Sequence, residues 1–154
     1  MKFKLHKSNL LEALNAVQGV VGARVTLPVL SNVLVAAEGE NLSFTTTDFT
    51  ITKRYTCKAE VLEPGEITLP VKRLTSIVRE LSDQIVEIAS DAKLADAVRM
   101  TCGSYRSKIT GIAAREFPKI PTAEDGLSFQ LDQGVVKEML RKTSYAAATH
   151  DAAR

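Results

Sequence analysis

Asp48 is the side chain in this sequence with the strongest claim to catalytic chemistry. It lies within Thr45–Thr50, where a carboxylate could act as a general base. No histidine, cysteine or second carboxylate stands nearby at a spacing that would complete a catalytic pair. An aspartate that caps a tight turn between two strands is the favoured interpretation. A small α+β enzyme that uses Asp48 is kept as an alternative, in which Asp48→Asn would abolish an activity.

The remaining residues of chemically active types form no recognisable motif. His6 and His150 each lack a second ligand at the i+2 to i+4 spacing of metal sites. Phosphate-binding and nucleophile motifs such as G-x-x-x-x-G-K-[ST] and G-x-S-x-G are absent from the sequence. Gly19 and Gly22 flank an expected helix end, where glycine typically terminates a helix. We therefore expect no catalytic residue, no metal site and no cofactor.

Basic side chains on two expected helices are better candidates for a function. The formal net charge is only +2, so the placement of the charges matters more than their sum. A row of cations along phosphates gives affinity without base recognition. This pattern predicts sequence-independent contact with double-stranded DNA, whereas an ordinary solvated helix face is the alternative. The cations are Lys72, Arg73 and Arg79 on one helix, and Lys137, Arg141 and Lys142 on the next.

The elements that carry these cations belong to an internal repeat. Three segments share one template, two alternating apolar residues of a strand followed by four at helical spacing. The template starts at Phe3, Ile67 and Phe129, so the offsets are 64 (67 minus 3) and 62 (129 minus 67) residues. Ser8 is expected to cap the first helix, and Pro70 to end a strand and start the second helix. The further strands expected between helices are Val29–Ala37, Asn41–Thr47, Ile51–Val61, Gln84–Ala89, Ala97–Cys102 and Tyr105–Ile112.

Two such units predict one α+β domain with its helices on one face of antiparallel sheet. We expect this domain to occupy residues 1–121. The segment Arg115–Gly126 contains two prolines, a glycine and mixed charge, which is typical of a linker. Residues 122–154 are expected to start a further domain with a strand and a helix but without its sheet. The chain is therefore interpreted as a fragment of a longer repeat protein.

Composition and cysteine use favour a cytoplasmic protein. The chain is 45% hydrophobic and 25% charged, as is usual for a globular domain. Cys57 and Cys102 are interpreted as free thiols of buried strands. The N-terminus alternates charged and apolar side chains, unlike a signal peptide, and no apolar run approaches the ~20 residues that span a bilayer. No membrane association is expected.

Three stretches resemble the replicative sliding clamps of bacteria, the family of the DNA polymerase III beta subunit. Gly22–Leu34 is close to the signature R-x-T-L-P-[IV]-L-[SG]-N-[VL]-L. Leu42–Ile51 is similar to L-x-[LF]-x-[AG]-T-D-[LF]-x-[IM], and Ala113–Pro118 is similar to the domain-joining [AE]-[DE]-[FY]-P. The resemblance implies three similar domains per protomer and a ring of two protomers. Helices would line the hole of this ring around duplex DNA.

The resemblance also implies roles for individual positions. Arg24, Lys72 and Arg73 match DNA-facing positions of the family, and Arg79, Lys137 and Arg141 join them through the charge pattern. Such a protein tethers the polymerase and is not an enzyme. The partners implied are DNA polymerase III core and the clamp loader, through a pocket mostly beyond this chain, and a second protomer along Lys108–Ile112. An open repeat scaffold that binds protein partners through its sheet edge is the alternative.

Overall fold

The computed structural model describes residues 1–22, 27–91, 96–120 and 129–147. The chain divides into two compact units, Met1–Ile120 and Pro121–Arg154, which are described here separately. The first unit contains two antiparallel sheets, with strand orders β5-β1-β7-β8-β9 and β4-β3-β2-β6. Its elements are β1 (Lys2–His6), α1 (Lys7–Gln18), the 3-10 turn η1 (Pro28–Ser31), β2 (Asn32–Glu38), β3 (Asn41–Thr47), β4 (Thr52–Lys58), β5 (Glu60–Glu63), β6 (Gly65–Pro70), α2 (Val71–Glu80), β7 (Ile85–Ser90), β8 (Ala97–Cys102), β9 (Tyr105–Thr110) and the 3-10 turn η2 (Ala114–Glu116).

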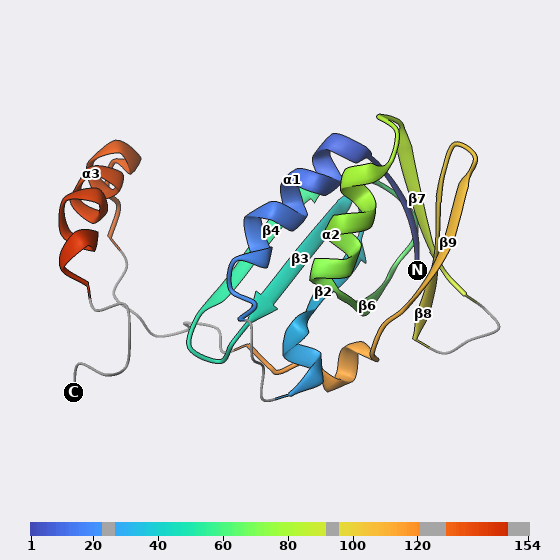
Figure 1. Ribbon diagram of the computed structural model, residues 1–154, viewed down its shortest axis with the longest axis horizontal. Helices are drawn as coiled ribbons and strands as arrows, with labels where there is room; N and C mark the ends of the chain where they lie inside the picture. Colours follow the sequence, from blue (N-terminus) through green and yellow to red (C-terminus); the bar gives the residue numbers. More distant parts are fainter. Residues whose placement is uncertain (23–26, 92–95, 121–128, 148–154) are drawn as a thin grey trace. The chain divides into compact units, whose positions relative to one another are not determined.

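The two helices lie side by side on one face of the first unit, as Figure 1 shows. Both are amphipathic, and their buried residues recur at helical spacing. Helix α1 buries Leu10, Ala13, Leu14 and Val17, and α2 buries Val71, Leu74, Thr75 and Val78. These side chains join one core with both sheets, so the α+β domain with helices on one face is confirmed.

The two sequence repeats exchange their first strands. Strand β1 of the first repeat pairs with β7 of the second, with Phe3 opposite Ile88. Strand β6 of the second repeat pairs with β2 of the first, with Val35 opposite Ile67. Each sheet therefore contains strands of both repeats. Neither repeat can complete its sheet alone, and the two fold as one domain.

The expected strand Ile51–Val61 is in fact two strands in different sheets. The chain leaves β4 at Ala59 and continues as β5, which pairs with β1. The second repeat turns in the same way after β9, where Ile112 forms an isolated bridge to Thr68 of β6. The expected strand Tyr105–Ile112 therefore ends at Thr110. One corner thus joins the sheets at their β4 and β5 edges, and the other joins them at their β6 and β9 edges.

Two local expectations were wrong in detail. Helix α1 begins one residue before Ser8, and its N-cap is His6, whose ring nitrogen Nδ1 accepts a hydrogen bond from the Ser8 backbone nitrogen at 3.4 Å. Strand β2 begins at Asn32, because Pro28 starts a 3-10 turn that the Ser31 hydroxyl closes by donating to the Pro28 carbonyl at 2.6 Å. The prediction that Pro70 ends a strand and precedes the second helix is confirmed.

The second unit is described only over residues 129–147, which form α3 (Gln133–Thr143) and the 3-10 turn η3 (Ser144–Ala146). Asp132 caps α3 by accepting a hydrogen bond from the Val135 backbone nitrogen at 3.1 Å. The apolar stripe of α3 is exposed, with Met139 58% and Leu140 64% accessible. Across the described parts of the chain, no helix is long and apolar enough to cross a membrane.

Candidate nucleic-acid interface

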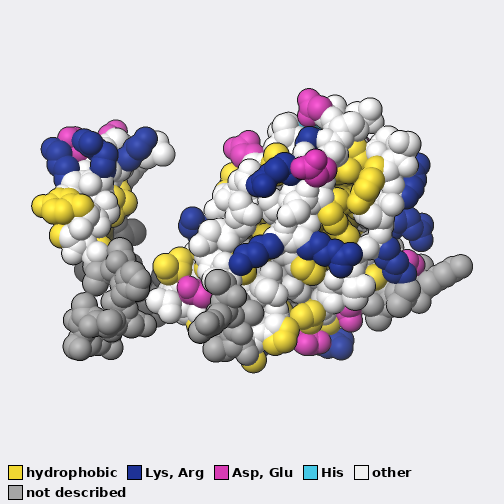
Figure 2. All heavy atoms as spheres, viewed as in Figure 1, with side chains coloured by type: hydrophobic (Ala, Val, Ile, Leu, Met, Phe, Trp, Pro, Cys, Tyr) yellow, Lys and Arg dark blue, Asp and Glu magenta, His cyan; other side chains and the backbone are white. Residues whose placement is uncertain are grey.

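Helix α2 presents its three cations because its other face belongs to the core. Leu74 and Val78 are fully buried, which turns Lys72, Arg73 and Arg79 towards solvent. Lys72 and Arg79 are seven residues apart and lie on one stripe, and Arg73 lies on the neighbouring stripe. Within the described residues, no acidic side chain forms an ion pair with any of the three. Figure 2 shows several Lys and Arg side chains on the face that carries α1 and α2.

Lys72 also links α2 to the segment that follows α1. Its Nζ donates to the Gly22 carbonyl at 3.1 Å. An ammonium group has three donors, so this bond leaves two for another acceptor such as a phosphate. Gly22 precedes Arg24 by two residues, and Arg24 itself lies outside the described residues. Lys72 is thus both an exposed cation and an anchor for the chain that leads to Arg24.

A reciprocal bond joins the other ends of the two helices, and sequence analysis did not single it out. The Nζ of Lys7, in the first turn of α1, donates to the carbonyl of Leu81, the residue that caps the end of α2. A cation at a helix C-terminus also interacts favourably with the helix dipole. Each helix therefore has a lysine in its first turn that bonds to a carbonyl just beyond the end of the other helix. These two bonds link the opposite ends of the antiparallel helices α1 and α2.

Helix α3 carries the other predicted cations. Lys137 and Arg141 are exposed and one turn apart on the same side of the helix. Lys142 instead forms an ion pair with Glu138, with Nζ 2.8 Å from Oε1. Among residues 129–147, Lys137 and Arg141 have no acidic partner. Lys72, Arg73 and Arg79 share one helix of the first unit, whereas Lys137 and Arg141 share one helix of the second.

Asp48 caps the hairpin between β3 and β4, as the sequence predicted. Its Oδ1 accepts hydrogen bonds from the backbone nitrogens of Thr50 at 2.9 Å and Ile51 at 2.7 Å. These bonds, first that of Ile51 and then that of Thr50, hold the pKa of the Asp48 carboxyl below its ordinary value. The described residues include no group of three or more His, Cys, Asp or Glu side chains that could hold a metal ion. Asp48 thus has a structural role in a turn.

Asp48→Asn is expected to reduce stability modestly. The asparagine oxygen still accepts a backbone hydrogen bond, but without the charge that strengthens it. Because folding lowers the pKa of Asp48, its contribution is present above the ordinary pKa of aspartate and is lost as pH falls through the lower folded value. The urea midpoints of the two proteins should therefore differ at pH 7 and converge in strong acid. A difference of equal size at both pH values would contradict the carboxylate's role.

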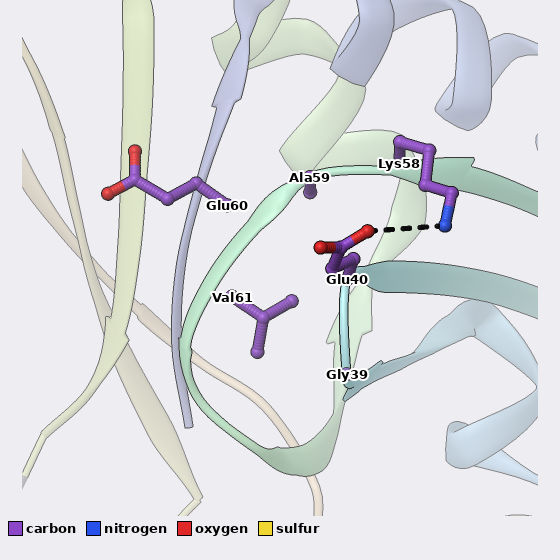
Figure 3. Close-up of a pocket in the computed structure, with 6 residues that line it drawn as sticks. All are labelled: Gly39, Glu40, Lys58, Ala59, Glu60 and Val61. Atoms are coloured by element: carbon purple, nitrogen blue, oxygen red, sulfur yellow. Dashed lines mark ion pairs between the residues drawn. The ribbon is translucent and has the colours of Figure 1, made fainter.

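The open hollow in Figure 3 offers no reactive group. It measures about 670 Å³ and lies where the β2–β3 turn meets the β4–β5 corner. Lys58 and Glu40 form an ion pair across it, with Nζ 3.5 Å from Oε2, and Glu60 is paired with Lys4 at 3.3 Å. Its charges are thus already matched within the domain. The lining residues are Gly39, Glu40, Lys58, Ala59, Glu60 and Val61.

The outer edge of β9 has features of a surface that another strand could extend. Among the described strands, its backbone pairs with β8 on one side and with none on the other. The Ser107 hydroxyl is buried without a hydrogen-bond partner among the described residues. On the opposite face of β9, Lys108 pairs with the largely buried side chain of Asp91, with Nζ 3.0 Å from Oδ2. A strand edge that no described strand pairs with is able to accept a further chain.

Comparison with known proteins gives one consistent match. Residues 1–121 match the family described as DNA polymerase III beta subunit, N-terminal domain. The chain is 32% identical over 151 residues to the beta sliding clamp of Chlamydia muridarum, covering 98% of this chain and 41% of that protein. It is 34% identical over 153 residues to the beta sliding clamp of Pseudomonas putida, with the same two coverages.

Solved structures agree with these relatives. The DNA polymerase III subunit beta of Pseudomonas aeruginosa superimposes with a TM-score of 0.90 at 34% identity, covering 99% of this chain and 41% of that one. The sliding clamp of Bartonella birtlesii, bound to griselimycin, gives a TM-score of 0.92 at 26% identity, covering 99% and 40%. The chain thus spans about two fifths of the length of these relatives.

Proposed function

We propose that this chain is the N-terminal part of a DNA sliding clamp, because it belongs to the DNA polymerase III beta subunit family. Residues 1–121 match the N-terminal domain of that family. The family is one of non-catalytic processivity factors for DNA replication. The proposed protein encircles duplex DNA and tethers the replicative polymerase. The observation that carries this proposal is a helix-bearing face whose exposed α2 cations have no acidic partners among the described residues.

The proposed mechanism is topological. A closed ring cannot leave a circular duplex, so individual phosphate contacts can be weak, and weak contacts allow sliding. Exposed side chains such as Lys72, Arg73 and Arg79 contact phosphates through charge and carry no base-specific readout. Arg24, Lys137 and Arg141 are proposed to act in the same way in the complete ring. Base-specific hydrogen bonds would hold the clamp at one sequence and oppose its movement.

Ring closure is proposed to use the edge of β9. An additional strand from a second protomer would pair with its backbone. The exposed ring of Tyr105, 39% accessible, lies at the start of the same strand and would be buried with it. The proposed assembly is a homodimeric ring in the cytoplasm. DNA polymerase III core and the clamp loader are its proposed partners, through a pocket that involves parts of the protein beyond this chain.

The proposal predicts that the full-length gene product containing this chain stays on circular DNA and leaves linear DNA. The protein would be loaded onto a nicked circular plasmid, and the DNA-bound fraction separated by gel filtration before and after cutting the plasmid once. Retention on the circle and release after cutting are expected, because the ends let the ring slide off. Equal behaviour on both forms would favour the open scaffold that binds protein partners through its sheet edge.

A further inference from the structure

Strand β4 places Lys53 on the helix-bearing side of its sheet. Side chains alternate along a strand, so Lys53 shares a side with Tyr55. The Tyr55 hydroxyl donates to Oε1 of Glu12 in α1 at 3.0 Å, which identifies that side as the one that carries the helices. Arg54 points to the opposite side, where its Nε donates to the Thr45 hydroxyl at 3.3 Å. Two adjacent cations of β4 therefore face opposite surfaces of the domain.

The ammonium group of Lys53 reaches the end of α1. Its Nζ lies 4.0 Å from the position that a Cβ atom on Gly19 would occupy, and Gly19 is the C-cap of α1. Helix α1 has no basic residue in its own last turn. Lys72 approaches the same segment from α2, through its bond to the Gly22 carbonyl. Two exposed cations from different elements thus flank the four residues Gly19–Gly22.

Helix α1 itself presents almost no free positive charge. Its sequence, KSNLLEALNAVQ, contains one cation, Lys7, which bonds to the Leu81 carbonyl. Its exposed side carries the neutral amides of Asn15 and Gln18, which are bonded to each other at 2.9 Å. A duplex lying across both helices would meet the three cations of α2 but no comparable charge contributed by α1. Lys53 is the exposed cation that fills this gap.

We propose that Lys53 is a further phosphate-contacting residue of this surface, and that it extends the positive row of α2 past the end of α1. The inference rests on the proposed function, because it assigns an additional residue to the same DNA contact. The ligand it would contact is the phosphate backbone of a duplex, without regard to sequence. A lysine in this place would add one phosphate contact to the total.

The test compares Lys53→Ala with Arg54→Ala, which removes the same charge from the opposite side of the same strand. Affinity for a short duplex labelled with a fluorophore is measured by anisotropy across a range of salt concentrations. A plot of log K against log salt has a negative slope, and each lost phosphate contact makes that slope less steep by about 0.9. Lys53→Ala is expected to show that decrease, Arg54→Ala to retain the wild-type slope, and Lys53→Arg to retain it as well. Urea denaturation of each variant checks that the fold is intact.

The other outcomes are decisive too. If Lys53→Ala keeps the wild-type slope while Lys72→Ala lowers it, the inference fails and the proposed function stands. A loss of stability without a change in slope would show that Lys53 serves only the end of α1. Equal decreases for Lys53→Ala and Arg54→Ala would trace the effect to net charge and overturn the inference. Absence of any salt-dependent duplex binding by the wild-type chain would overturn the inference, whereas the proposed function is overturned only if the full-length protein is retained equally on circular and linear DNA.

Discussion

The triple replacement of Lys72, Arg73 and Arg79 by alanine is expected to make the negative slope of log K against log salt less steep by about 2.7, or about 0.9 for each phosphate contact. Over a fourfold rise in salt, the wild-type affinity should then fall about 40-fold more than that of the variant. The physical cause is that each cation which neutralises a phosphate releases a condensed counterion, and this release is less favourable at high salt. Fluorescence anisotropy with a short duplex measures both slopes directly.

The substitution should leave the fold intact, because all three side chains are exposed. Among the described residues, Lys72 is the one of the three that forms a hydrogen bond within the protein, to the Gly22 carbonyl, and such a bond is worth about 1 kcal/mol. Arg79 lies in the last turn of α2, where a cation favours the helix by only a few tenths to about 1 kcal/mol. Urea denaturation would separate these small losses from a loss of binding.

A control with the same loss of charge distinguishes an effect of the position of the α2 cations from an effect of the net charge of the protein. Replacing Arg54, Lys58 and Arg106 removes three cations from strand positions that face away from the helices. Its salt slope is expected to stay close to that of the wild-type chain. If both triple variants lose the same slope, the cations of α2 have no special place in DNA binding and the helix face is an ordinary solvated surface.

Gly111→Ala is expected to destabilise the first unit by about 3 kcal/mol or more, a loss that overpacking and broken hydrogen bonds produce together. A Cβ atom at Gly111 would lie 1.9 Å from the Thr68 carbonyl oxygen, far inside van der Waals contact. That oxygen accepts a hydrogen bond from the Ile112 backbone nitrogen at 3.1 Å. Relief of the clash requires the corner between β9 and β6 to open and this bond to break.

The surroundings leave the corner little room to shift. Thr68 is fully buried, and its hydroxyl donates to the Ile112 carbonyl at 2.8 Å while it accepts from the Asn32 amide at 3.0 Å. The Gly111 nitrogen donates to the Asp96 carbonyl at 2.6 Å. These hydrogen bonds therefore hold the backbone at the distance that excludes a side chain. Glycine is required here because another backbone approaches closely, not because of its own backbone angles.

Gly39→Ala is the matched control for this prediction. Gly39 has a φ of +56°, and nothing lies within 4 Å of the position of an added Cβ atom. Alanine there meets only the strain of a left-handed conformation, about 1 kcal/mol. The urea midpoint of Gly111→Ala, measured by circular dichroism, should therefore be well below that of Gly39→Ala. Equal losses would show that the corner at Gly111 yields to a methyl group.

Much of the local structure follows from the sequence alone. Strands β3 and β8 coincide with the segments expected from alternating apolar residues and flanking turn residues. The helical stripe that begins at Leu74 turns Lys72 and Arg79 to solvent, so the candidate surface of α2 was predictable too. These features depend on neighbours within a few positions along the chain. Their pattern is visible in any short window of sequence.

Strand partners and long contacts were decided only by the tertiary structure. A strand pattern shows which side chains are buried, but it does not show which edge the strand will join. The exchange of β1 and β6 between repeats, and the break at Ala59 that sends β5 to the other sheet, depend on which edges the packed helices leave available. The bond from Lys72 to Gly22 and the approach of Lys53 to α1 join residues distant in sequence. Periodicity within each segment is silent about such pairs, because their proximity arises from burying both helices in one core.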